Sequence, residues 1–288
     1  MRVLDNFASG RRENLAGAMG EIDLVEGDMQ SYERCSTAVR GCDVVFHQAA
    51  LPSVPRSVAD PLTSNAVNVT GTLNILLASR DAGVRRVVFA SSSSVYGANP
   101  DLPKSEEMAT LPISPYAVAK QAAEAYCRAF TKVYGLETIS LRYFNVFGPR
   151  QDPQSEYAAV IPKFITSVLA GRRPTIFGDG EQSRDFTYVD NVVDANILAS
   201  RSTSTDVIGS HVNVACGSRI SLNQTLAEIE RLSGMPADAI YADPRPGDVK
   251  HSMASIELAR RALDFRPSVE FKAGLQATLE SHVAAAPV

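Results

Sequence analysis

The sequence predicts an α/β fold, with a doubly wound parallel sheet followed by a smaller α/β lobe. In the first half of the 288 residues, short runs rich in β-branched residues alternate with helical stretches. Such alternation is typical of right-handed βαβ units. After about residue 148, prolines and glycines break the pattern into shorter elements. We therefore expect one domain at 1–148 and a second lobe at 149–288, with 186–208 packing back on the first domain.

The strands are expected where short apolar runs occur. Met1–Asp5 reads as a strand that ends in a carboxylate, and further runs follow at Ile22–Val25, Val44–Phe46, Arg86–Ala90 and Glu137–Arg142. Their length and β-branched content favour strands over helices.

The helices lie between these runs. The clearest helical stretch of the first half extends from Pro61 to Ala82. Another begins at Ser114-Pro115, because proline is tolerated in a first turn, and stops at Gly135 after about Tyr134. In the second lobe, Asp190–Ser200 and Leu222–Ser233 have good helical patterns.

Tyr116 and Lys120 form the most informative pair of residues. At positions i and i+4 of a helix, the two side chains stand on one face. An ammonium group beside a phenol favours the phenolate, so the tyrosine can act as a base near neutral pH. The pattern alone is common in solvated helices, but the run Ser91–Ser94 ends a strand about two dozen residues earlier. We expect a serine there to carry the proton between the tyrosine and a substrate hydroxyl.

Composition excludes several other classes of function. The net charge of −4 is spread along the chain, which argues against a nucleic-acid partner. Four scattered cysteines read as reduced structural thiols, and His47 reads as a packed core histidine. No metal site is expected, because no histidines, cysteines and carboxylates occur at metal-binding spacing. With no stretch apolar enough to span a bilayer, we expect a cytoplasmic protein without a membrane partner.

The start of the chain lacks an element that a dinucleotide-binding fold normally has. In such folds a glycine-rich turn precedes the acidic ribose ligand by about 20 residues. Asp5-Asn6 resembles that ligand, yet only four residues precede it, and no G-x-x-G-x-x-G occurs in the chain. We expect a misassigned start codon or a fragment, in preference to a genuine variant. The chain as printed is expected to bind NAD weakly, because the amides that cradle the pyrophosphate are missing.

Three further stretches point to a family: Leu141–Arg150, Ser183–Asp190 and Arg245–Asp248. With Tyr116 and Lys120, they resemble the extended short-chain dehydrogenase/reductase family, in particular its bacterial UDP-hexose 4-epimerases that act on N-acetylated sugars. The resemblance implies a Rossmann-like sheet, lacking its first strand and helix, and the cofactor NAD. It also implies a homodimer formed through a helix pair that includes Pro115–Tyr134.

The same resemblance implies roles for residues of the first domain. Ser92, Tyr116 and Lys120 would be catalytic, with Ser92 as the proton relay, although its neighbours in the serine run stay open as alternatives. Lys120 would also bond the nicotinamide ribose. The cofactor-binding residues would be Asp5, Asn6, Asp28, Ala49, Ala50, Asn68, Tyr116, Lys120 and Phe144.

For the second lobe, the resemblance implies a UDP-sugar site. Asn145 would bond the sugar diphosphate, Val160 would lie beside the uracil, and Ser252 would border the sugar C2 substituent. Arg184 and Arg245 would meet the pyrophosphate, for which a planar cation with several donors is well suited. Asp248 would accept from the uridine ribose, and Ser92 would also contact the sugar.

The function expected from these residues is NAD-dependent 4-epimerisation of a UDP-hexose through a transient 4-keto sugar. The sugars expected are UDP-N-acetylglucosamine and UDP-N-acetylgalactosamine, with UDP-glucose and UDP-galactose as a further possibility. A nucleotide-sugar dehydratase or decarboxylase is an alternative, but such enzymes use carboxylates where this chain has Ser93 and Ser94. A non-catalytic remnant that binds nucleotide sugar is the other alternative.

Overall fold

The computed structural model describes residues 1–152, 159–244 and 250–285. These residues form two compact units. The first unit comprises Met1–Asn99, Ala109–Arg142 and Asn196–Val212, and the second comprises Pro100–Met108, Tyr143–Ala195 and Asn213–Val288. The domain boundary that we expect at residue 148 stays a prediction.

A four-stranded sheet carries the first unit, and its strand order is β10-β5-β4-β3. β3 and β4 are parallel, with Val44 opposite Arg86 and His47 opposite Phe89. Two further strands, β1 and β2, form a separate parallel pair. The parallel pairing confirms the predicted α/β class. The strands are β1 (Arg2–Asp5), β2 (Asp23–Glu26), β3 (Val44–His47), β4 (Arg86–Ser92), β5 (Glu137–Tyr143) and β10 (Ser210–Val214).

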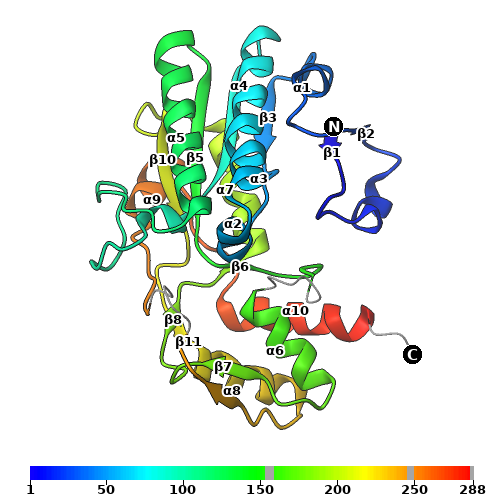
Figure 1. Ribbon diagram of the computed structural model, residues 1–288, viewed down its shortest axis with the longest axis vertical. Helices are drawn as coiled ribbons and strands as arrows, with labels where there is room; N and C mark the ends of the chain where they lie inside the picture. Colours follow the sequence, from blue (N-terminus) through cyan, green and yellow to red (C-terminus); the bar gives the residue numbers. More distant parts are fainter. Residues whose placement is uncertain (153–158, 245–249, 286–288) are drawn as a thin grey trace. The chain divides into compact units, whose positions relative to one another are not determined.

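Strand β4 is the centre of the first core. All of its residues before Ser92 are buried, as is typical of a parallel strand covered on both faces. Val87 and Phe89 pack in one hydrophobic cluster with Leu76 of α4 and Cys127 of α5. Figure 1 shows α4 and α5 side by side. The helices of this part are α1 (Tyr32–Val39), α2 (Val54–Ala59), α3 (Pro61–Asn65), α4 (Thr72–Asp81), α5 (Pro115–Tyr134) and the portion of α7 (Val189–Arg201) that follows Ala195.

Helix α5 begins and ends where the sequence predicts. The Ser114 side chain accepts a hydrogen bond from the Ala117 N–H, and Pro115 is the first helical residue. Gly135 ends the helix with φ of 73°, a left-handed conformation that glycine adopts without steric cost.

The predicted continuous helix Pro61–Ala82 is wrong in its middle, where Ala66–Gly71 forms a π-helical segment between α3 and α4. The Thr72 hydroxyl donates to the Asn68 carbonyl at 2.7 Å and also lies 2.9 Å from His47 Nε2. Burial lowers the pKa of His47 to about 3, so this ring is neutral, as expected for a core histidine. Single-turn π-helical insertions occur often at functional sites.

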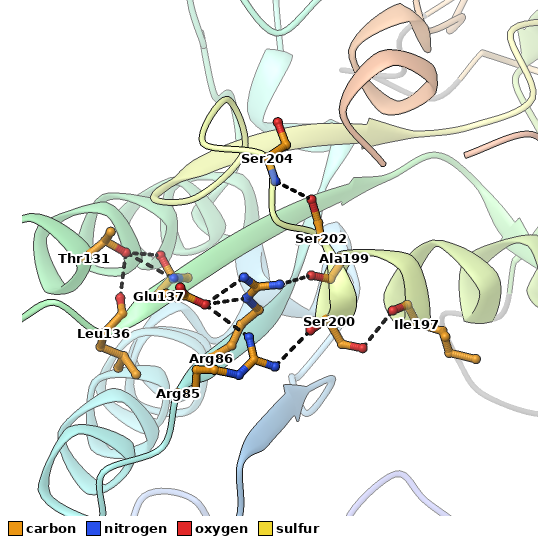
Figure 2. Close-up of polar contacts among 11 residues, drawn as sticks. Arg85, Arg86, Thr131, Leu136, Glu137, Ile197, Ala199, Ser200, Ser202 and Ser204 are labelled. Carbon is orange, nitrogen blue, oxygen red and sulfur yellow. Dashed lines mark hydrogen bonds and ion pairs between the residues drawn. The ribbon is translucent and has the colours of Figure 1, made fainter. Parts of the chain in front are cut away.

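Two neighbouring arginines, the buried Arg86 and the exposed Arg85, fix the end of α7 to the start of β4 (Figure 2). Arg86 is only 2% exposed, and its guanidinium donates to Glu137 at 3.0 and 2.7 Å and to the Ala199 carbonyl at 2.8 Å. Arg85 adds bonds to Glu137 and to the Ser200 carbonyl. Carbonyls at a helix C-terminus lack intrahelical partners, so these cations satisfy them and complement the helix dipole.

The second unit consists of short strand pairs and helices around its own core. Phe147, Phe164, Ile165, Ile229 and Leu275 are among the buried members of this core. The segment Pro100–Met108 belongs to this unit, and the Lys104 N–H donates to the Met253 carbonyl at 2.8 Å. The strands pair as β6 (Val146–Phe147) with β9 (Thr187–Tyr188), β7 (Thr175–Phe177) with β12 (Ile240–Ala242), and β8 (Ser183–Arg184) with β11 (Ile220–Ser221). The remaining helices are α6 (Val160–Leu169), α8 (Leu222–Ser233), α9 (Glu257–Leu263) and α10 (Phe271–Ala285).

Candidate active site

The three predicted catalytic residues meet between helix α5 and the end of strand β4. Tyr116 and Lys120 lie one turn apart on α5, and Ser92 is the last residue of β4. The Ser92 hydroxyl lies near the Tyr116 phenol and lowers the pKa of that phenol. A base, a cation and a hydroxyl relay are thus present together within the first unit.

Lys120 is held rigidly and away from water. It is 3% exposed, its Nζ donates to the Ala90 carbonyl at 2.7 Å, and Nζ lies 4.8 Å from the centre of the Phe89 ring. Burial lowers the pKa of Lys120 to about 8. An amine with such a pKa can hold or release a proton near neutral pH.

The structure corrects the expected ionisation of Tyr116. The helix pattern predicts a lowered pKa, but burial raises the pKa of the phenol, and the nearby Ser92 side chain offsets only part of this effect. The Lys120 ammonium lies 5.9 Å from the centre of the Tyr116 ring and donates to Ala90. Desolvation is therefore the largest influence on the pKa of Tyr116.

The serine run separates into different roles. Ser91 is 3% exposed and donates to Glu124 Oε1 at 2.5 Å, so its hydroxyl is already occupied. Ser92 contacts both Tyr116 and the Ser94 hydroxyl, the latter at 3.0 Å. Ser94 donates its N–H to Ser92 Oγ at 3.2 Å. This arrangement supports Ser92 over Ser91 as the relay.

A buried ion pair behind the catalytic residues was not predicted. Arg142 of β5 donates to both carboxylate oxygens of Glu124, at 2.9 and 2.8 Å, and its guanidinium lies 4.8 Å from the centre of the Tyr96 ring. Glu124 stands one turn beyond Lys120 on α5. Extending the i, i+4 pattern by one more step would have found Glu124, whereas nothing in the sequence joins it to Arg142.

The predicted ribose-binding residues Asp5 and Asn6, at the end of β1, lie close to Asp28, a residue after β2 that is predicted to lie by the adenine. Asn6 Nδ2 donates to Asp28 Oδ2 at 2.8 Å, and Asp5 Oδ1 accepts from the Phe7 N–H at 2.7 Å. A Cβ on Gly10 would lie 3.0 Å from Asp5 Oδ2, so the chain passes close to this carboxylate. Carboxylates and an amide suit the hydroxyl groups of a ribose, and this donor set fits that part of NAD.

The other predicted cofactor residues have structural partners. Asn68 is 2% exposed, accepts from the Leu51 N–H at 2.8 Å and donates to the Leu51 carbonyl at 3.0 Å. It thereby holds the segment that follows Ala49 and Ala50. Phe144 is completely buried in the second unit, and its N–H donates to the Val214 carbonyl at 3.1 Å. The cofactor contacts of these four residues stay predictions.

A cavity of about 300 Å³ lies in the second unit, and it contains three of the predicted substrate residues, Asn145, Val160 and Arg184. Arg184 Nη1 donates to the Ser183 and Lys250 carbonyls at 3.1 and 3.2 Å, which fixes the guanidinium. The remaining wall is formed by Val146, Phe147, Ala159, Ile161, Lys163, Phe164, Thr175, Phe177, Gln182, Phe186 and Leu222.

These neighbours give the cavity a mixed character that the sequence did not predict. Four phenylalanines supply flat apolar surface, and Lys163 adds a second cation to the wall that contains Arg184. Gln182 is 7% exposed and donates to the Phe177 carbonyl at 2.5 Å, joining two parts of the wall. Aromatic faces suit a nucleotide base, and two cations suit a diphosphate.

Ser252 lies beside this cavity without lining it. Its N–H donates to the Ser183 carbonyl at 3.0 Å, so it pairs with the strand that carries Arg184. Arg245 and Asp248 lie outside the described residues. Over the described part of the chain, no cluster of histidine, cysteine and carboxylate side chains could hold a metal ion. Within those same ranges, no helix has the length and apolarity required to cross a membrane.

Replacing Lys120 by Met should stabilise the fold. A lysine whose pKa falls from 10.5 to about 8 on folding destabilises the protein most below pH 8, and the penalty disappears as the pH rises toward 10.5. At pH 7, Lys120→Met should therefore raise the free energy of unfolding by roughly 1 to 3 kcal/mol after loss of the Ala90 bond. Urea denaturation measures this change, with the exposed Lys132→Met on the same helix as a control. A less stable Lys120→Met variant would show that the hydrogen bond outweighs desolvation.

Comparison with known proteins agrees with this geometry. Residues 1–215 match the model of the NAD dependent epimerase/dehydratase family. A UDP-glucose 4-epimerase of Mycolicibacterium smegmatis is 39% identical over 285 residues, covering 96% of this chain and 88% of that protein. More distant curated relatives include UDP-sugar decarboxylases.

Two solved structures extend the similarity to nearly the whole chain. A UDP-N-acetylglucosamine 4-epimerase from Methanobrevibacter ruminantium, in complex with UDP-N-acetylmuramic acid, is 41% identical with a TM-score of 0.94, covering 99% of this chain and 91% of that one. A UDP-glucose 4-epimerase from Thermus thermophilus, in complex with NAD, is 37% identical with a TM-score of 0.89 at the same coverage. The chain therefore belongs to the NAD dependent epimerase/dehydratase family.

Proposed function

We propose that this chain catalyses the 4-epimerisation of a UDP-hexose. The observation that carries the proposal is the cluster of Ser92, Tyr116 and Lys120, because it places a base, a relay hydroxyl and a cation in one desolvated site. The cavity that contains Asn145 and Arg184 supports a nucleotide diphosphate as the anchoring group.

In this reaction Tyr116 removes the proton of the sugar 4-hydroxyl through Ser92. Bound NAD supplies a hydride acceptor and donor, and its oxidised ring carries a positive charge. Lys120 adds its own charge near the phenol, which lowers the cost of forming the phenolate. The resulting 4-keto sugar turns over within the site, and Tyr116 returns the proton when C4 is reduced on its other face.

Anchoring and rotation place different demands on the site. Arg184 is fixed by two carbonyls and suits a diphosphate that stays bound while the sugar turns. A dehydratase or decarboxylase would need an additional acid or base beside the relay. Ser93 and Ser94 occupy those positions and carry no carboxylate, which favours epimerisation over these alternatives.

Substituting Tyr116 by Phe should abolish epimerisation while the fold is retained. Loss of a general base costs about 10²–10⁴-fold in rate. The measurement is the turnover of a UDP-hexose by the NAD-loaded protein, with products identified by NMR and folding checked by circular dichroism. Turnover above about a tenth of wild type would mean that Tyr116 is not the base. A product that has lost water or carbon dioxide would instead favour the alternative reactions.

We propose that the substrate pair is UDP-N-acetylglucosamine and UDP-N-acetylgalactosamine. The proposal rests on Ser252, a small residue that pairs with the Ser183 backbone next to Arg184. A bulky side chain at this position would collide with an N-acetyl group at the sugar C2, whereas serine leaves room for it.

Ser252→Tyr should therefore remove activity on the N-acetylated sugars selectively. Steric exclusion discriminates by pocket shape and leaves the diphosphate contacts unchanged. The ratio of kcat/KM for acetylated and plain UDP-hexoses measures the effect, and Ser252→Ala, which keeps the residue small, should leave the ratio unchanged. An unchanged ratio in the Tyr variant would show that Ser252 does not border the C2 substituent.

We also propose that the protein forms a homodimer through α5. Val118, Tyr126 and Val133 on this helix are 52%, 39% and 69% exposed. At 100° per residue they fall within about 80° of the helix circumference, so they form one apolar stripe. Leu62 of α3 is 83% exposed, and α3 packs beside α5. A second copy of the same stripe would cover this surface with two-fold symmetry.

Placing lysines at Val118 and Val133 should convert the dimer into a monomer, because four like charges would face one another in the interface. Sedimentation equilibrium should give twice the chain mass of 30.9 kDa for the wild type and the single mass for the variant. Tyr241→Lys, at a 57% exposed aromatic of β12, is the matched control and should stay dimeric. A wild-type protein of 30.9 kDa would contradict the proposal.

A further inference from the structure

The first turn of α5 has its backbone donors satisfied from two places in the sequence. Pro115 has no N–H, the Ala117 N–H donates to Ser114 Oγ at 3.2 Å, and the Val118 N–H donates to the Ser114 carbonyl at 3.0 Å. The Tyr116 N–H instead donates to Ser57 Oγ at 3.0 Å, across 59 positions of sequence. Helix α2 therefore supplies, through Ser57, the hydrogen-bond acceptor for the backbone N–H of Tyr116.

The Ser57 hydroxyl is oriented to accept this bond. Its own proton is donated to the Val54 carbonyl at 2.7 Å, so a lone pair remains for Tyr116. Ser57 is 1% exposed, and water cannot replace it without opening the packing between α2 and α5. Loss of this hydroxyl would leave the Tyr116 N–H buried without a partner, which destabilises the first turn.

Helix α2 is in turn anchored by the segment that follows β3. Asn68 holds both backbone groups of Leu51, and the Ser53 side chain caps α2 by accepting from the Arg56 N–H at 3.2 Å. Ser53 adopts φ of 104°, which a non-glycine residue adopts only when its surroundings impose it. A series of polar contacts thus runs from Asn68 through Leu51 and α2 to Tyr116.

We infer that Ser57 is a positioning residue for the catalytic Tyr116, fixing the base through its backbone N–H. The inference rests on the proposed function, in which Tyr116 exchanges a proton with the substrate. A displacement of about 1 Å at a reacting group can cost about 10²-fold in rate. The first turn of α5 must therefore be held in place for Tyr116 to transfer its proton at the full rate. Because the bond is to the backbone N–H, Ser57 holds residue 116 in place whether or not the phenol hydroxyl is present, whereas its effect on the rate requires the phenol.

The first test is the exchange rate of the Tyr116 amide proton, which requires no activity. Labelling with ¹⁵N-tyrosine gives one signal for each of the nine tyrosines, and Tyr116→Phe identifies the signal of residue 116. Ser57→Ala should accelerate exchange of that amide at least about tenfold, because its acceptor is gone. Ser57→Thr should retain protection. Ser79→Ala is the matched control: Ser79 is 0% exposed, and among the described residues its hydroxyl has no partner.

The second test is a double-mutant cycle with Tyr116→Phe. Ser57→Ala should lower kcat about tenfold and leave KM for the UDP-sugar within about twofold, with activity restored by Ser57→Thr. In the Tyr116→Phe background, Ser57→Ala should cause no further loss of rate, although the loss of stability persists because the N–H of residue 116 remains. Merely structural damage would lower the rate in both backgrounds.

The outcomes separate the two proposals. Unchanged exchange in Ser57→Ala, or an equal rate loss in both backgrounds, overturns the role of Ser57. A wild-type protein that exchanges normally but turns over no UDP-hexose overturns the proposed function, and the amide measurement still decides whether Ser57 holds Tyr116. If Ser57→Ala does not fold, Ser57→Cys takes its place, because a thiol of similar size is a weaker acceptor and should give an intermediate exchange rate.

Discussion

The contact between helix α5 and strand β4 is the interaction on which the candidate site depends. Successive residues of β4 each meet a different residue of one helix face: Ala90 accepts from Lys120, Ser91 donates to Glu124, and Ser92 lies near the Tyr116 phenol. Polar groups removed from water must find partners or destabilise the fold. The partners here are so specific that a rotation or slip of α5 would break several bonds together.

The buried polar groups of this contact lower the stability of the fold, but they give the candidate catalytic residues unusual pKa values. A hydrophobic residue in place of a buried lysine or a buried ion pair often gives an equal or more stable fold. The first unit nevertheless buries Lys120 and the pair Glu124–Arg142 beside its core. The low polarity that weakens the fold is also what moves the proton affinities of Tyr116 and Lys120 away from their ordinary values.

Local patterns in the sequence predicted those features that are determined by residues close together along the chain. The start of α5 at Pro115, its end at Gly135 and the pairing of Tyr116 with Lys120 all follow from residues within a few positions. The π-helical segment around Asn68, the ion pair to Arg142 and the bond from Ser57 join distant parts of the chain, so no local pattern reveals them. The predicted lowering of the Tyr116 pKa is wrong for a related reason, because the burial that raises this pKa arises only in the folded chain.

The path of the chain between the two units limits how this protein can diversify. The backbone passes from one unit to the other five times, after residues 99, 108, 142, 195 and 212. Neither unit is a continuous stretch of sequence, so a gene fusion or a single exchange of segments cannot transplant the cavity onto a different catalytic unit. New substrate preferences must then arise by replacing residues in place, one wall position at a time, while the chemistry is inherited unchanged.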